Sequence, residues 1–479
     1  MRQIALIATS LVILGLFKLE RDREARASSA LWLPVIWLFL GASRAVSLWL
    51  GNTAIMESPD QYLEGSPLDR TVYAILLGAT VLVLVRRRTR TLAFLRANPL
   101  ILVFLLYCAA SVLWSDFPLV AFKRWAKTVG NVAVVLVALT DDEPLTAIKR
   151  LFSRTGFLMI PTSILLIKYY PEFGRGYSVS GQTFYSGVST DKNGLGVICM
   201  IWGLFSLWRF VVAYRDKNAS GRAGTLAAHG AILVMIVWLL SMADSSTSTV
   251  CLIVGSGLLI LGPGIARRGS AGIHALIATL ACVALLPYAF QDVWESFTQS
   301  LGRHTDLTGR TELWTELLQF NVNPWIGTGF ESFWLGDRAR HFWEEYWWHP
   351  NQAHNGYLET YLNLGWIGVV LLVLLMAIAY RNAIRAFQRN VPWAPLLLPF
   401  VVIVVIYNVT EAAFKVTHPV YIAFLFPAIA LPAIGSQTRA DPTAEPAWPM
   451  VEPIAFEADA FESYDEVQLT KADSIPLES

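Results

Sequence analysis

Apolar runs recur along almost the whole of this 479-residue chain and constrain its fold more than any other feature. Apolar residues make up 55% of the sequence and charged residues only 15%, a balance that disfavours a soluble globular protein. We therefore predict an all-α polytopic membrane protein of about 12–13 transmembrane helices. The number is approximate because several runs are shorter than the roughly twenty residues that a spanning helix needs. The runs lie near 4–17, 31–50, 71–85, 99–114, 128–140, 155–169, 194–213, 225–243, 249–262, 271–289, 364–380, 394–410 and 418–435.

Lysine and arginine residues collect in every second loop between these runs, for example at 18–26, 86–90 and 381–389. Loops of this kind stay in the cytoplasm, so the long loop 290–363 is expected on the extracytoplasmic face. The basic segment 123–127 falls on the outer side by the same count. There it lies at the level of the lipid headgroups or binds an anion.

The sequence predicts four parts. They are an N-terminal transmembrane bundle (1–289), an extracytoplasmic catalytic loop (290–363), C-terminal transmembrane helices (364–435) and an acidic cytoplasmic tail (436–479). The tail has ten acidic residues, two basic residues and five prolines, a composition typical of a disordered segment.

The outer loop 290–363 is the one stretch with room for a folded element outside the membrane. Its segment 311–320 has helical spacing, Asn323-Pro324 ends that pattern, and Gly327-Thr-Gly329 indicates a tight turn. The loop also holds seven tryptophans. Tryptophans at a membrane boundary are mostly interfacial anchors, but so many in one loop also suit flat platforms for sugar rings.

Two arginines of the loop, Arg303 and Arg310, flank a short glycine-containing turn. A guanidinium fork binds phosphate oxygens in a bidentate manner, and the alternative partners are Glu312, Glu316 or lipid headgroups.

His354 lies just before the apolar run that begins at 364. It is either a capping or packing residue or a proton acceptor, since imidazole has an ordinary pKa of about 6.5. The histidines at 341, 349 and 354 are eight and five residues apart, which fits no common zinc pattern. All four cysteines lie in apolar runs, so neither disulfides nor a metal site is expected.

Three polar residues outside the loop are further candidates. Lys192 and Asn193 open the run 194–213 from the outer side, where a lysine either snorkels or meets an anionic group. Glu411 ends the run 394–410 on the same side, and an acid at that depth indicates function.

Four sequence segments together carry a family resemblance. The first three are Trp114-Ser-Asp-Phe-Pro118 leading into Lys123-Arg124, Asp191-Lys-Asn-Gly194, and Gly302-Arg-His-Thr-Asp-Leu-Thr-Gly-Arg-Thr-Glu-Leu-Trp314 running on to Asn323-Pro-Trp-Ile-Gly-Thr-Gly-Phe-Glu-Ser-Phe-Trp334. The fourth is His354-Asn355, followed by nine residues to Gly365 and two more to Gly368. With these segments the sequence resembles the superfamily of O-antigen ligases and Wzy-type polysaccharide polymerases, and most closely its ExoQ-like exopolysaccharide-polymerase branch.

The resemblance implies a membrane glycosyltransferase of the GT-C kind that takes glycan from an undecaprenyl-diphosphate carrier, inverts the anomeric centre and needs no nucleotide sugar, metal or other cofactor. It places the family's essential histidine on His354 and its conserved arginine on Arg310. Asn355 would orient the imidazole or bind the acceptor. The turn 244–249 lacks the arginine that ligase-like members carry, which leaves Lys192 or Arg124 as the remaining phosphate contact.

Three functions remain open on these grounds. A polymerase would join lipid-linked repeats in the bacterial cytoplasmic membrane with its active site facing the periplasm, and the resemblance favours it; a flippase and a chain-length regulator would be its partners. A ligase would use the same donor but transfer glycan to lipid A–core or another acceptor. A transporter is disfavoured, because most ionisable groups lie at the ends of the runs rather than at mid-bilayer. No feature indicates nucleic-acid binding.

Overall fold

The computed structural model describes residues 1–20, 27–51, 65–177, 181–218, 220–266, 269–289, 308–389 and 391–429. The expectations for Arg303, for residues 290–307 and for the tail 436–479 therefore lie outside the described residues. By contacts, the described residues all belong to one compact unit. The four-part division of the chain stays a prediction.

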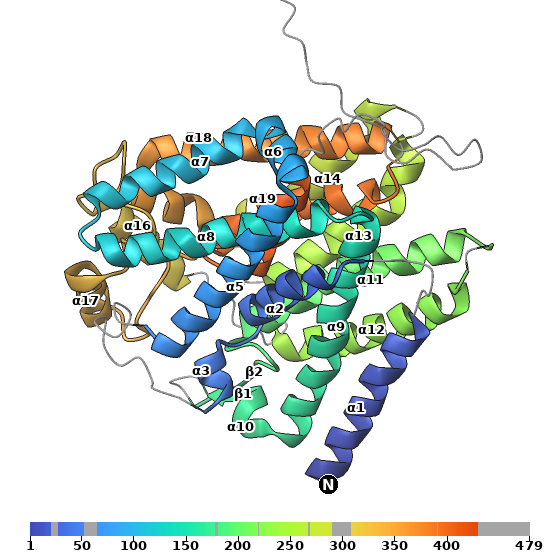
Figure 1. Cartoon of the computed structure of the whole chain (residues 1–479). Helices are drawn as coiled ribbons and strands as arrows, with labels where there is room; N and C mark the ends of the chain where they lie inside the picture. The colour runs from blue at the N-terminus through green and yellow to red at the C-terminus, as the bar shows by residue number, and fades with distance from the viewer. Residues whose placement is uncertain are drawn as a thin grey trace, which may run out of the picture. The chain divides into compact units, whose positions relative to one another are not determined.

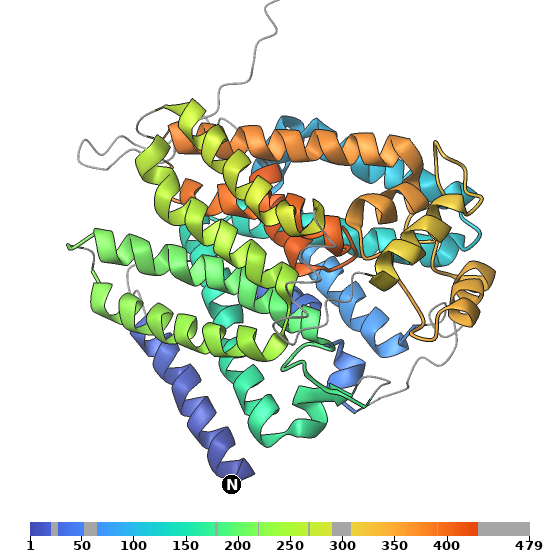
Figure 2. The ribbon, with the colours of Figure 1, turned by 180° about the vertical axis from the view of Figure 1, so that it is seen from behind.

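Helices dominate the described residues (Figures 1 and 2). The strands β1 (Arg175–Tyr177) and β2 (Thr183–Tyr185) form one antiparallel pair. The helices are α1 (Arg2–Leu19), α2 (Trp32–Ala42), α3 (Val46–Trp49), α5 (Pro67–Arg86), α6 (Arg88–Ala97), α7 (Pro99–Ala110), α8 (Pro118–Leu139), α9 (Pro144–Tyr169), α10 (Pro171–Gly174), α11 (Lys192–Arg215), α12 (Arg222–Ala243), α13 (Ser246–Ala266), α14 (Ser270–Ala289), α16 (Thr308–Gln319), α17 (Gly336–Glu345), α18 (Gly356–Gln388), α19 (Ala394–Thr410) and α20 (Pro419–Ala428), with short 3-10 turns at Ser29–Leu31 and Ser111–Trp114.

The expected all-α polytopic membrane protein is confirmed. Within the described residues, seven helices are long and apolar enough to cross a membrane, or eight if the pair Arg88–Ala97 and Pro99–Trp114, bent by 88°, counts as one span. Every predicted apolar run overlaps a helix. Four apolar helices, however, have only 10–17 residues and are shorter than the candidate spans. Two of the four, α19 and α20, are buried almost throughout, so neighbouring helices surround them.

The helix α11 lies in the core of the bundle and packs against α9, α12, α13 and α19. Every residue from Leu195 to Ser206 is buried. Glycines permit the close approach: a Cβ atom at Gly196 would lie 2.7 Å from the Ser248 hydroxyl at the start of α13. This packing fixes the first turn of α11, which contributes to the site described below.

The basic segment at the start of α8 has partners inside the protein. Arg124 donates a hydrogen bond to the backbone carbonyl of Glu331, and the Lys127 ammonium lies 4.6 Å from the centre of the Tyr73 ring. Lys123 is exposed. Arg124 and Lys127, two of the three basic residues that did not fit the charge pattern of the loops, thus contact other helices or loops.

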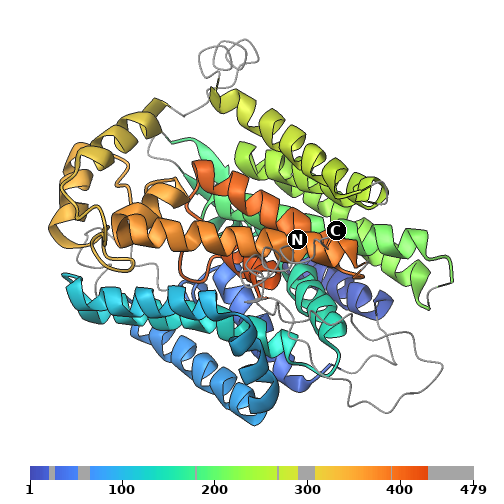
Figure 3. The same cartoon turned by 90° about the horizontal axis from the view of Figure 1, so that it is seen from above.

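Residues 308–363 pack onto the bundle around their own apolar cluster. The helix predicted at 311–320 is confirmed as α16. In Figure 3, α16, α17 and the first turns of α18 gather at one end of the bundle. The buried members of the cluster are Leu313, Leu317, Phe333, Trp334, Phe342, Ala353 and Leu362.

The Asn323-Pro324 segment meets α18 where that helix is broken. Gly365 has φ 63° and ψ −168° inside α18, and the amide of Trp366 donates to the Pro324 carbonyl at 2.8 Å. A Cβ atom at Gly365 would lie 2.2 Å from the carbonyl carbon of Trp325, so this position requires glycine. The segment at Asn323-Pro324 and the segment that runs from His354 to Gly368, which both carry the resemblance, are therefore in direct contact.

Candidate functional site

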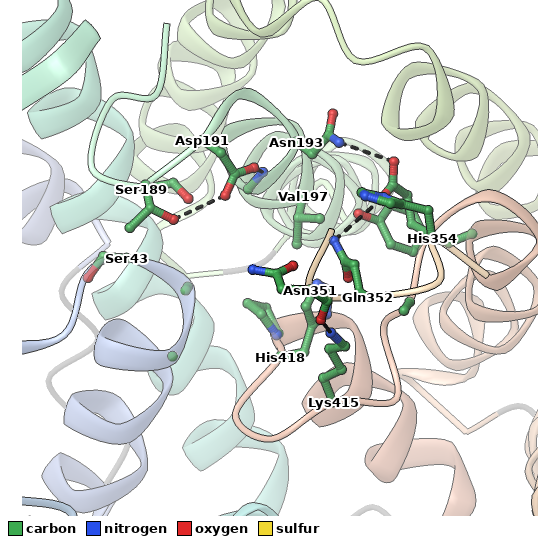
Figure 4. A pocket seen from close by; sticks show the side chains of 18 of the residues that line it. Ser43, Ser189, Asp191, Asn193, Val197, Asn351, Gln352, His354, Lys415 and His418 are labelled. Carbon is green, nitrogen blue, oxygen red and sulfur yellow. Dashed lines mark hydrogen bonds and ion pairs between the residues drawn. The ribbon is translucent and has the colours of Figure 1, made fainter. Parts of the chain in front are cut away.

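A cavity of about 480 Å³ opens where four segments meet: the end of α2, the start of α11, the loop before α18, and the connection between α19 and α20 (Figure 4). Its size is typical of small-molecule sites. The lining residues are Gly41, Ala42, Ser43, Ser189, Thr190, Asp191, Asn193, Gly194, Val197, Trp348, His349, Pro350, Asn351, Gln352, His354, Tyr407, Glu411, Ala412, Lys415, His418 and Pro419.

His354 faces this cavity from the residue before the N-cap of α18. Its φ of 48° is left-handed, an unusual conformation for a residue with a side chain. The conformation is held from both sides: the Ala353 amide donates to the Glu359 carboxylate at 2.7 Å, and the Asn355 carboxamide oxygen accepts from two amides of the first helical turn, each at 3.0 Å. The imidazole is therefore placed by the start of a rigid helix.

Glu411 collects three side-chain partners just after α19. Its Oε1 accepts from Arg310 Nη2 at 3.0 Å and from Asn193 Nδ2 at 3.1 Å, and its Oε2 lies 3.2 Å from His354 Nδ1. Burial of the carboxyl raises its pKa, but the His354 hydrogen bond and the Arg310 charge outweigh that effect, and the pKa of Glu411 is lowered from its ordinary value. Glu411 is thus an ionised carboxylate in the neutral pH range.

The charge of Glu411 decides the tautomer of His354. An ionised carboxylate only accepts hydrogen bonds, so His354 Nδ1 must carry the proton that points to it. The Gln352 amide nitrogen also lies 3.5 Å from the same Nδ1, a longer contact with a neutral group, and the charge-assisted bond to Glu411 takes precedence. The neutral imidazole then has its lone pair on Nε2, where it can accept a proton.

Arg310, on α16, is not a lining residue of the cavity and completes the arrangement from behind Glu411. It also donates to the backbone carbonyl of Thr410, so it holds the end of α19 as well as the carboxylate. The alternative partners considered from the sequence, Glu312 and Glu316, are not the ones it uses. Of the five guanidinium N–H groups, these contacts occupy two, and the side chain is 23% exposed.

The structure therefore unites four of the sequence-predicted site residues: His354, Arg310, Asn193 and Glu411. The others lie apart. Asn355 caps α18 through its side chain, and Lys192 is exposed on the first residue of α11 and does not line the cavity.

Arg124 does not line the cavity either, and it contacts the Glu331 backbone. The proposed phosphate contacts at Lys192 and Arg124 remain predictions without support from the cavity's geometry.

Several tryptophans of the outer loop have structural partners. The Trp314 indole donates to the Ala353 carbonyl at 2.6 Å, and the Trp334 indole donates to Glu359 at 3.0 Å. Trp348 lines the cavity, with its ring 5.9 Å from that of His354. Trp347 is 68% exposed. Of these four tryptophans, only Trp348 lines the cavity, where its ring could face a sugar, whereas Trp314 and Trp334 make hydrogen bonds within the protein.

Sequence reasoning missed the lining residues Asn351, Gln352, Lys415 and His418. The only available signal for Lys415 was its position, four residues after Glu411 in an otherwise apolar stretch. Among the described residues, no group of three or more His, Cys, Asp or Glu side chains is arranged to hold a metal ion.

Parts of this chain are similar to known proteins. Residues 230–373 match the family described as O-antigen ligase, and this region contains Arg310 and His354 but not Glu411. The chain is also 22% identical over 296 residues to the exopolysaccharide production protein ExoQ of Rhizobium meliloti (strain 1021). That match covers 60% of this chain and 65% of the relative, so the chain spans slightly less than two thirds of the relative's length. The two matches support an O-antigen ligase and ExoQ-like family for this multi-pass membrane protein.

Proposed function

We propose that this protein is an inverting membrane glycosyltransferase that polymerises exopolysaccharide repeat units carried on undecaprenyl diphosphate, at the periplasmic face of the bacterial inner membrane. The observation that carries the proposal is the contact of His354 with Glu411, which Arg310 holds from the other side, beside a polar cavity. Family membership supports glycan chemistry, and the geometry supplies a proton acceptor with a defined tautomer.

The proposed reaction forms one bond and breaks one. The acceptor hydroxyl oxygen attacks the anomeric carbon of the donor sugar while its proton passes to His354 Nε2. The bond between that carbon and the phosphate oxygen breaks, and its electron pair leaves with the undecaprenyl diphosphate. Attack from the face opposite the leaving group inverts the anomeric centre. Glu411 stabilises the imidazolium that forms and does not itself take up the proton.

Arg310 has two roles in this proposal. It compensates the charge of Glu411, and the guanidinium N–H groups that Glu411 and Thr410 do not occupy can bind a donor phosphate oxygen. Charge that develops on the leaving diphosphate is stabilised best by donors that are already fixed in place. The anchoring of Arg310 to the end of α19 provides that fixation.

A ligase that transfers the glycan to lipid A–core or another acceptor is the second candidate. It is favoured by the description of the matched family as O-antigen ligase, whereas the ExoQ relative favours exopolysaccharide synthesis. The two candidates share the donor chemistry and differ only in the acceptor.

The test is a transfer assay with purified protein in lipid nanodiscs and a lipid-diphosphate oligosaccharide as the only substrate, in the presence of a metal chelator. A polymerase lengthens the glycan on the lipid under these conditions. A ligase leaves the glycan on the carrier lipid unchanged in length and transfers it to lipid A–core once that acceptor is added. No transfer to either acceptor, with protein that elutes as a single folded species, contradicts the proposal.

A further inference from the structure

Lys415 is the one lysine or arginine among the residues that line the cavity, all of which lie in the described part of the chain. It belongs to the connection between α19 and α20, and its Nζ donates to the Asn351 backbone carbonyl at 3.2 Å. Figure 4 shows Lys415 and His418 across the cavity from Asp191 and Asn193. The ammonium thus occupies the opposite wall from the start of α11.

The two carboxylates that line the cavity already have partners. Glu411 is bound by Arg310, Asn193 and His354. Asp191 caps α11: its Oδ1 accepts from the Gly194 amide at 2.8 Å. Lys415 donates instead to a carbonyl, and the carboxyl that its charge acts on is Glu331, which lies outside the lining and whose pKa is raised by burial.

His418 adds a second hydrogen-bond donor beside Lys415. Its Nδ1 accepts from the Val420 amide at 3.3 Å, so the neutral ring carries its proton on Nε2. Burial, followed by the nearby Lys415 charge, lowers the pKa of His418 to about 4, which keeps the ring neutral at pH 7. The ring thus has an N–H to donate without a charge of its own.

The rest of the lining has the chemistry of a carbohydrate site. Side-chain amides and hydroxyls exchange hydrogen bonds with sugar hydroxyls, and the Trp348 ring provides an apolar face. The amides and hydroxyls belong to Asn193, Asn351, Gln352, Ser43, Ser189 and Thr190.

We propose that the cavity is a subsite for an anionic carbohydrate and that Lys415 pairs with its anionic group. This inference rests on the proposed glycan transfer and specifies the ligand of the same site. The anion is either the diphosphate of the carrier or an acidic substituent of a sugar, because an ammonium recognises phosphate and carboxylate oxygens alike. Lys415 lies outside residues 230–373, the region matched to the family.

The test is equilibrium binding of three probes to the full-length protein in nanodiscs: a short-chain prenyl diphosphate, a glucuronic-acid disaccharide and the matching neutral glucose disaccharide. The wild type should bind one anionic probe more tightly than the neutral one, and this preference should weaken with added salt. Lys415→Gln should lower the affinity for that anionic probe by about tenfold or more and leave the neutral one unchanged. Lys415→Arg should restore most of the preference.

Lys217→Gln, at an exposed site between α11 and α12, is the matched control and should bind all three probes as the wild type does. The probe that responds to Lys415 identifies the source of the anion. An absent preference for either anionic probe in the wild type, which needs no variant, overturns the inference. So does a loss that follows Lys192→Gln instead of Lys415→Gln. Because binding is measured without turnover, Lys415-dependent binding in a protein that never transfers glycan would refute the proposed function and leave this inference intact.

Discussion

The two walls of the cavity are built in different ways. The wall that carries His354 comes from one contiguous segment, in which an N-cap at Asn355 and a helix break at Gly365 follow in order. The other wall assembles from helix ends that are far apart in sequence, around Asn193 and Glu411, and Glu411 lies 3.2 Å from His354. The first wall presents the proposed base, and the second presents the groups that determine its tautomer and bind charge. A recognisable signature thus locates the reactive group but not the residues that tune it.

The largest effect is expected on the signature wall. His354→Ala should reduce glycan transfer by about 10²–10⁴-fold, the usual contribution of a general base, in the purified transfer assay. Membrane insertion should be unchanged, because a residue before a helix start adds little to the burial of that helix. His341→Ala is the matched control: this histidine lies on α17, 52% exposed, beside Glu316. Transfer that survives His354→Ala and is lost in His341→Ala would reverse the assignment.

Arg310 contacts Glu411 and the end of α19, and its replacement should have the next largest effect. Arg310→Lys keeps the positive charge but removes the planar fork, so it cannot hold the Thr410 carbonyl, Glu411 and a phosphate oxygen together. Loss of one fixed donor to a developing anion costs about 10²–10³-fold in rate. The turnover of Arg310→Lys at saturating donor measures this. A rate equal to that of the wild type would reduce Arg310 to a surface ion-pair partner.

Glu411→Gln should lower the transfer rate by about 10- to 100-fold. Loss of a carboxylate that orients an imidazole in a metal site has an effect of this size. The amide preserves shape but can present its N–H to His354 Nδ1, which favours the wrong tautomer. Asp191→Asn is the control from the same wall, because Asp191 caps α11 and makes no contact with His354. Equal losses in both variants would indicate a general effect on the fold.

The smallest effect concerns stability. The pKa of Glu411 is lowered in the folded protein, so its ionised form stabilises the fold at every pH above its unfolded value of about 4.5. That contribution is lost as the pH falls through the lower, folded pKa. The melting temperature of the wild type should therefore exceed that of Glu411→Gln at pH 7, and the difference should shrink below pH 4.5. A difference that grows on acidification would show that the carboxyl is protonated in the folded state.

The sequence predicted much of the fold because hydrophobicity acts locally along the chain. Each apolar run became a helix, and the helix α16 was expected from its spacing. The count of spanning helices was harder to predict, since α19 and α20 are short and buried by neighbouring helices rather than by lipid. Composition gives no information about which apolar surface a helix faces.

In the site, likewise, single residues could be predicted from the sequence but their contacts could not. His354 was predicted from its motif and Glu411 from its depth, yet nothing in the sequence indicated that the two touch. Residues 354 and 411 are brought together by the packing of α18 against α19, a tertiary contact. Lys415 was missed because a single lysine between apolar helices is most often a solvated end, and only the cavity distinguishes it.

The central claim is that Glu411 orients His354 as a base, and the dependence of the transfer rate on pH tests it most directly. In the wild type the rate should fall on acidification, because a protonated imidazole cannot accept the hydroxyl proton. In Glu411→Gln the maximum rate should be lower, because the amide can present its N–H to His354 Nδ1 and favour the wrong tautomer. A maximum rate equal to that of the wild type would contradict the claim and leave Glu411 as a structural ion-pair partner of Arg310.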